Sequence, residues 1–167
     1  MLDAIKKLVS GRIRASEGAG PIQAAHLELG SRGERAALQY LEREAGYLIV
    51  ATNFIVPLGR GLRNQKITGE IDIVAYDKDT LVFVEVKTRA SDVFSAPERA
   101  VDLRKQRQIA RAARRYRQMM KVSEETYRFD VVTVIPGDGG FILELLPGYF
   151  SDSIFQRSRY FERYSST

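Results

Sequence analysis

The 167-residue sequence contains no cysteine and a single histidine, His26. Without cysteine, disulfide frameworks and thiolate metal sites are excluded. His26 lies in a polar N-terminal stretch, so neither a zinc site of several histidines nor a nucleophile paired with a histidine base can be built. If the protein is an enzyme, carboxylates and lysines must carry its chemistry.

Long hydrophobic runs are also missing. No stretch of roughly 18 or more apolar residues occurs, so no membrane span is expected. The basic segment 1–14 lacks the apolar core and cleavage site of a secretory signal, and a cytoplasmic location fits. We expect a short helix or a frayed tail there, with attachment to lipid or nucleic acid as the alternative.

Acidic residues are outnumbered by basic ones, 21 to 26, which gives a net charge of +5. A hydrophobic fraction of 44% indicates a globular chain, and its length indicates one domain with a sizeable core. The basic balance favours a polyanionic partner, either nucleic acid or an anionic membrane.

Apolar periodicity and turn residues predict a helix, three strands, a second helix and two further strands. The helices are expected over residues 31–45 and from a capping box at Ser95–Glu98 to about residue 121. The strands are expected over residues 47–56, 70–76, 81–89, 127–135 and 141–146. This order predicts an α/β fold, a mixed β-sheet of about five strands flanked by helices.

Segments of small or polar residues separate the predicted elements. Residues 15–25 are interpreted as a linker and residues 57–69 as a glycine-rich basic loop. The expected organisation is an N-terminal extension with some helical character (1–29), a folded domain (30–147) and an aromatic, basic tail (148–167).

Two strands of this pattern, joined by a short turn, carry charged residues among apolar ones. A turn centred on residues 78–79 places Asp72 opposite Glu85 and Glu70 opposite Lys87, all four on one face. Opposed like charges repel, and burying unpaired carboxylates costs several kcal/mol. A shared proton, a protein cation or a metal ion would relieve this, and two such carboxylates suit Mg²⁺.

Lys87 follows Glu85 by two residues, some 6–7 Å along the strand. From there its ammonium could reach a phosphate oxygen or an attacking water. The pattern therefore indicates metal-assisted hydrolysis of a phosphodiester. The alternative is structural: Glu70 and Lys87 would form a cross-strand ion pair, and Asp72 would lie on a solvated face.

A further carboxylate, Glu34, lies on the apolar side of the first predicted helix, because it precedes Leu38 by four residues and Leu41 by seven. This position is compatible with a site residue. The segment SRGE is also a capping box, in which Glu34 would reach back to Ser31. Both interpretations stay open at this point.

The second predicted helix is strongly basic. Residues 99–121 contain nine arginines or lysines and one acid, Asp102. One-signed charge attracts phosphates, although a solvated helix face is the alternative. The predicted nucleic-acid contacts are Lys105, Arg89, Arg104 and Arg111. The basic residues of the predicted loop would add to them.

Four sequence blocks occur in order: GERAALQYLE, GEIDIVAYD, LVFVEVKTR and RFDVV. With these blocks, residues 30 to about 146 resemble the YraN family of proposed bacterial endonucleases. That family is similar to the restriction-endonuclease superfamily, with its PD-(D/E)XK signature, and in its core to archaeal Holliday-junction resolvases. The resemblance implies a restriction-endonuclease-like fold.

The resemblance also implies roles for individual residues. Asp72 and Glu85 would be ligands of Mg²⁺, for which Mn²⁺ would substitute. Lys87 would position or deprotonate the attacking water, and Glu34 would lie near the metal ion through a water. The segment between residues 53 and 69 looks longer than the family pattern.

The implied function is a metal-dependent endonuclease that leaves a 5′-phosphate. Its substrate would be structured or branched nucleic acid, with DNA favoured over RNA, and a homodimer is compatible with such substrates. One alternative is a non-catalytic nucleic-acid-binding module on the same fold. Another is an interaction protein that docks through its tail or N-terminal helix.

Overall fold

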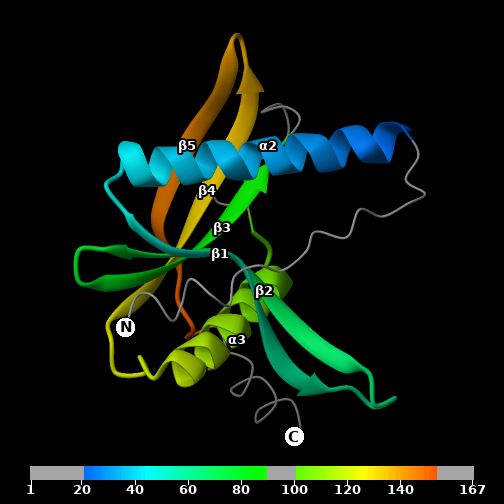
Figure 1. The fold of residues 1–167 in the computed structure, drawn as a ribbon, viewed down its shortest axis with the longest axis vertical. Helices are drawn as coiled ribbons and strands as arrows, with labels where there is room; N and C mark the ends of the chain where they lie inside the picture. Colours follow the sequence, from blue (N-terminus) through cyan, green and yellow to red (C-terminus); the bar gives the residue numbers. More distant parts are fainter. Residues whose placement is uncertain (1–20, 90–100, 154–167) are drawn as a thin grey trace, which may run out of the picture.

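The computed structural model describes residues 21–89 and 101–153 and places them in two helices and five strands. The elements are α2 (Pro21–Arg43), β1 (Leu48–Arg60), β2 (Lys66–Asp77), β3 (Thr80–Thr88), α3 (Leu103–Met120), β4 (Tyr127–Gly137) and β5 (Gly140–Phe150). The strands form one sheet in the order β1-β2-β3-β4-β5 (Figure 1). β3 and β4 run parallel, and the other neighbours are antiparallel.

One helix covers each face of this sheet. α2 contacts β3, β4 and β5 on one face, and α3 contacts β1 and β2 on the other (Figure 1). The central strand β3 is buried on both faces from Leu81 to Val86, and α3 lies in the crossover that its parallel pairing with β4 requires. The predicted mixed sheet flanked by helices is confirmed, and it is consistent with a restriction-endonuclease-like fold.

The β2–β3 hairpin has the predicted register. Tyr76 pairs with Leu81 and Ile73 with Val84, around the predicted turn. The ladder ends at Ile73–Val84, so the Asp72–Glu85 and Glu70–Lys87 positions lie beyond it.

β2 changes face where the ladder with β3 ends. Ile71 and Val74, three residues apart, both lie in the core beneath α3, whereas a regular strand would turn them to opposite faces. The expectation that regular alternation carries all four charges to one face is therefore wrong. The irregularity lies at Asp72 and Ile73.

α2 begins at Pro21, ten residues before the predicted start at Ser31. The linker interpretation is wrong for residues 21–25, and the helix continues across the predicted boundary at residue 30. Ser31 and Glu34 lie inside the helix, so the capping-box interpretation is also wrong. The first turns escaped prediction because residues 23–28 are exposed and carry no apolar stripe.

The predicted loop over residues 57–69 is wrong. β1 continues to Arg60 and β2 starts at Lys66, and this segment, the β-arm (residues 57–69), projects beyond the rest of the sheet (Figure 1). A register shift between Pro57 and Gly59 accompanies the positive φ of Gly59, 122°. Strand pairing holds the arm, and only its base, at Leu58 and Gly69, packs near α3, so most of its sequence lacks apolar alternation.

α3 begins at Leu103 after the N-cap Asp102, whose side chain accepts a hydrogen bond from the Lys105 backbone N at 2.7 Å. Val101 and Asp102 are not helical, so the prediction of one helix from residue 95 is wrong. The capping box Ser95–Glu98 lies outside the described residues, as do segments 1–20 and 154–167. β5 extends past the predicted boundary at 147, to Phe150. Neither described helix is long and apolar enough to cross a membrane.

A buried ion pair holds the hairpin-turn end of the sheet together. Asp130 is fully buried, and its carboxylate accepts hydrogen bonds from the Tyr47 hydroxyl at 2.9 Å and the Gly148 backbone N at 2.8 Å. Arg128 binds it through Nε at 3.0 Å and also reaches Asp77 Oδ2 at 2.8 Å. Because every charge has a partner, the cost of burying them is offset. The RFDVV block therefore has a structural role.

α2 approaches the end of β3 closely at Gly33. A Cβ atom on Gly33 would lie 2.1 Å from the Thr88 hydroxyl oxygen, whereas one on Gly30 would meet nothing within 4 Å. Glycine is unfavourable inside a helix, so its presence at position 33 is explained by this contact. The contact sets how near Glu34 comes to β2 and β3.

Gly33→Ala is expected to destabilise the protein by about 1–3 kcal/mol, because α2 must move away from Thr88. Gly30→Ala is the matched control, and improved helix propensity should stabilise it by about 0.5–1 kcal/mol. Urea unfolding of both variants measures the difference. Equal free energies of unfolding in the two variants would show that the close approach does not exist.

Candidate active site

Two carboxylates meet where β2 and β3 diverge. Asp72 Oδ2 accepts a hydrogen bond from the Val86 backbone N at 2.8 Å. Glu85 Oε1 lies 2.8 Å from Lys105 Nζ of α3. Glu85 is only 4% exposed, so its environment disfavours charge. Neither bond uses Asp72 Oδ1 or Glu85 Oε2.

Burial and the nearby Asp72 charge raise the pKa of Glu85 to about 7. The hydrogen bond and charge of Lys105 and the charge of Lys87 oppose this rise. Burial lowers the pKa of Lys105, but Glu85, Asp72 and Glu70 outweigh it and raise that pKa overall. The lysine therefore stays charged beside Glu85.

α2 brings a third carboxylate, Glu34, to the same place. Burial raises the pKa of Glu34, and the charges of Asp72 and Glu70 raise it further, while a side-chain hydrogen bond with Asn53 lowers it. Asn53 has a positive φ of 48°, while its neighbours Thr52 and Phe54 stay paired with Ile73 and Ile71 of β2. Glu34 thus lies on the side of α2 that faces Asp72 and Glu70.

The predicted residues lie in three places. Glu34, Asp72, Glu85, Lys87 and Lys105 come together at this site, with Lys87 exposed at its edge. Arg89 follows β3, and its backbone N donates to the Val134 carbonyl at 2.9 Å. Arg104 and Arg111 are exposed on α3.

Sequence reasoning missed Asn53 in this cluster. In the sequence, Asn53 is one polar residue inside the apolar run YLIVATNFIV, and its interaction with Glu34 depends on a backbone conformation that no motif marks. Its only signal is its residue type, because asparagine tolerates positive φ better than the residues around it.

The donors present suit a divalent cation with incomplete protein coordination. Within the described segments, no cluster of three or more acidic or histidine side chains is arranged to enclose a metal ion. Mg²⁺ needs no such cage, because it is commonly bound through one or two carboxylates, waters and substrate phosphates. Asp72 and Glu85 provide two carboxylates whose mutual repulsion a cation would relieve. The residues therefore fit Mg²⁺ or Mn²⁺.

Comparisons with known proteins place the chain among bacterial relatives. Residues 33–134 match the model of "Uncharacterised protein family UPF0102". A UPF0102 protein of Bacteroides thetaiotaomicron is 41% identical over 132 residues, which cover 79% of this chain and 99% of that protein. UPF0102 proteins of Caldicellulosiruptor saccharolyticus and Syntrophus aciditrophicus are 42% and 40% identical, over 64% and 75% of this chain and 81% and 90% of theirs.

Among solved structures, SSO0001 aligns with a TM-score of 0.38 and 13% identity, over 86% of this chain and 62% of that one. This likeness is too low to carry a functional argument.

The raised pKa of Glu85 predicts a pH-dependent stability without metal. The folded state binds a proton more tightly than the unfolded state, so stability is greatest below the ordinary pKa and falls as pH rises toward 7. Between pH 5 and 8 in EDTA, the free energy of unfolding should fall by roughly 2–3 kcal/mol less in Glu85→Gln than in wild type. Urea unfolding at the two pH values measures this.

Asp79→Asn is the control, because Asp79 is an exposed carboxylate at the hairpin turn. It should retain the pH dependence of wild type. Identical pH dependence in wild type and Glu85→Gln would contradict the account.

Proposed function

The chain belongs to the UPF0102 (YraN) family, and we propose that it is a metal-dependent endonuclease that hydrolyses phosphodiester bonds of nucleic acid. The observation that carries this proposal is that the Asp72 charge raises the pKa of both Glu34 and Glu85, with Lys87 and Lys105 beside Glu85. Perturbed carboxylates with nearby cations are typical of active sites.

Asp72 and Glu85 would hold the metal ion through their carboxylates, which the Val86 backbone N and the Lys105 ammonium each contact at one oxygen. When bound there, Mg²⁺ supplies positive charge that polarises the phosphoryl oxygens and offsets charge in the transition state. The Val86 backbone N keeps the Asp72 carboxylate oriented. Burial against α3 does the same for Glu85.

The chain's own lysines and third carboxylate would carry the remaining steps. Lys87, exposed at the edge of the site, donates hydrogen bonds to the attacking water and to a phosphate oxygen. The water oxygen bonds to phosphorus and gives up a proton to solvent, the P–O3′ bond breaks, and the 3′ oxygen takes a proton from solvent. Glu34 accepts a hydrogen bond from a water in the site, and Asn53 fixes its position. Lys105 neutralises Glu85 until a cation arrives.

The basic face of α3 supports nucleic acid as the substrate. Its 18 residues include seven arginines or lysines and no acidic residue. Arg104 and Arg111 are exposed there, near the Lys105 end and the middle of the helix. We propose DNA over RNA and a structured or branched form on the family resemblance alone. A cytoplasmic location and a two-fold dimer belong to the same proposal.

One observation favours a non-catalytic nucleic-acid-binding module instead. Lys105 already neutralises Glu85 at 2.8 Å, so the cluster can exist without a metal ion. Such a module has no use for the remaining repulsion between Asp72 and Glu85, however. Replacing Asp72 would then improve stability and leave nucleic-acid binding intact.

Asp72→Asn is expected to reduce cleavage of labelled branched and linear DNA in Mg²⁺ by roughly 100-fold or more, because a ligand worth several kcal/mol is lost. Lys87→Met should reduce the rate by a larger factor than it reduces DNA affinity, because Lys87 contacts one phosphate and the attacking water. The readouts are gel analysis of the products and anisotropy of the bound DNA.

Asp79→Asn, with the same charge change at the hairpin turn, is the control and should cleave like wild type. If Asp72→Asn gains stability and binds DNA normally while wild type cleaves no substrate, the binding module is the correct function. Cleavage that survives in Asp72→Asn would place the active site elsewhere.

A further inference from the structure

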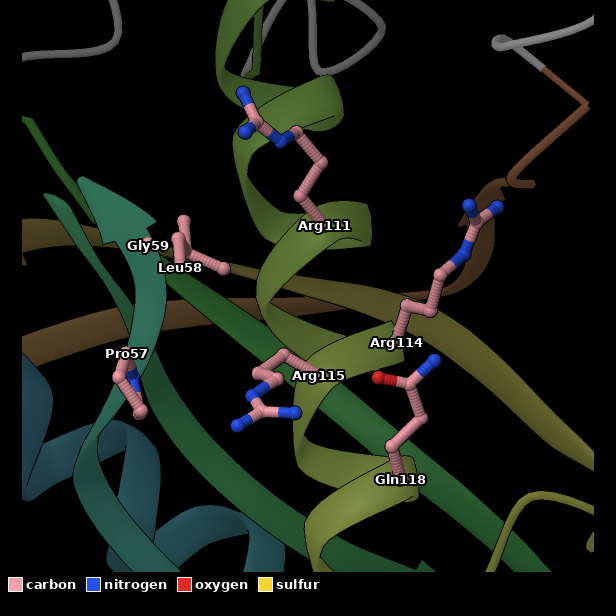
Figure 2. Close-up of a pocket in the computed structure, with 7 residues that line it drawn as sticks. All are labelled: Pro57, Leu58, Gly59, Arg111, Arg114, Arg115 and Gln118. Atoms are coloured by element: carbon pink, nitrogen blue, oxygen red, sulfur yellow. The ribbon is translucent and has the colours of Figure 1, made fainter. Parts of the chain in front are cut away.

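A groove lies between the β-arm and α3 (Figure 2), and none of the residues that line it belongs to the carboxylate cluster. Its volume is about 450 Å³. The residues that line it are Pro57, Leu58, Gly59, Arg111, Arg114, Arg115 and Gln118. Figure 2 shows Pro57, Leu58 and Gly59 of β1 on one side and α3 on the other, with Arg115 directed toward β1 and Arg114 directed away from it.

The fold builds this groove through a close contact at Gly69. A Cβ atom on Gly69 would lie 2.9 Å from the Ala112 Cβ and 3.1 Å from the Leu58 Cδ1. The absence of a side chain at position 69 therefore lets the arm lie against α3 at Ala112. Arg111 and Arg115 flank that contact on the exposed side of the helix.

The charge of the groove is of one sign. Three of its lining residues are arginines and none is acidic. Within the described segments, the ion pairs join Lys105 to Glu85 and Arg128 to Asp77 and Asp130, so none involves Arg111 or Arg115. Guanidinium groups gathered in a concave surface attract an anion, and their planar fork suits phosphate.

We propose that this groove binds the sugar–phosphate backbone of double-stranded nucleic acid. The inference rests on the proposed function and names its substrate class as a duplex. None of the lining residues is aromatic, whereas proteins that bind single strands typically stack bases on aromatic side chains. The charged side chains of the lining are all arginines, which bind the phosphates that a duplex presents on its outside.

The position of the groove fits a duplex that also reaches the carboxylate cluster. Arg111 and Arg115 follow Lys105 by six and ten residues, which places them about 9 Å and 15 Å further along the helix. At about 3.4 Å of duplex axis per base pair, this distance corresponds to roughly three to four base pairs. The groove would hold the backbone while a nearby phosphate lies at Asp72 and Glu85.

The test is binding of a labelled 20-base-pair duplex in EDTA, which separates binding from cleavage. The double variant Arg111→Gln/Arg115→Gln should bind at least roughly tenfold more weakly than wild type, and the slope of log affinity against log salt should become shallower by about 2. The matched control, Arg43→Gln/Lys78→Gln, removes the same charge from exposed positions at the hairpin-turn end. It should retain the affinity and salt slope of wild type.

Three outcomes would overturn the proposal. The first is equal weakening of duplex binding in the two double variants. The second is a groove variant that binds only a single-stranded oligonucleotide of the same length more weakly. The third is a groove variant that loses binding to anionic phospholipid vesicles while its duplex binding is unchanged. Weaker duplex binding by the groove variant alone upholds the groove, even if wild type cleaves nothing and the nuclease proposal fails. If wild type cleaves nucleic acid and the groove variant binds the duplex as tightly as wild type, the nuclease proposal stands and the groove proposal fails.

Discussion

Repulsion between the Asp72 and Glu85 carboxylates is the constraint around which this molecule is arranged. Glu85 is buried, and Asp72 raises its pKa, so the fold must bring a cation to it. Lys105 of the crossover helix α3 supplies that cation at 2.8 Å. From the other face, α2 adds Glu34 rather than relieving the charge, because glycine at position 33 lets the helix approach β3 closely. Both helices therefore place side chains at the carboxylate cluster.

Much of this arrangement is predictable from sequence because it depends on strong local signals. The two-residue turn between β2 and β3 fixes their register, and the continuous apolar run of β3 marks a central strand. Charged residues inside such strands then stand out as candidates. The structure brings Asp72, Glu85 and Lys87 near one another, as that reasoning expects.

The remaining features depend on geometry that leaves little trace in sequence. β2 changes face at Asp72, so regular alternation gave the wrong side-chain directions. The β-arm is held by strand pairing with little burial, and its content of glycines and basic residues is typical of a loop. Glu34 could be assigned to a cap or to the site only once the start of α2 was known. The groove between the β-arm and α3 arises from a contact between Gly69 and Ala112 that no local sequence pattern indicates.

The most direct test of the central claim is calorimetric titration of Mg²⁺ and Mn²⁺ into wild type, Asp72→Asn and the control Asp79→Asn. The account predicts one divalent site in wild type and in the control, lost in Asp72→Asn while the protein stays folded. Absence of divalent binding in wild type, with a bound duplex as well as without, would contradict it. The carboxylate cluster would then be a structural ion-pair network in which Lys105 neutralises Glu85.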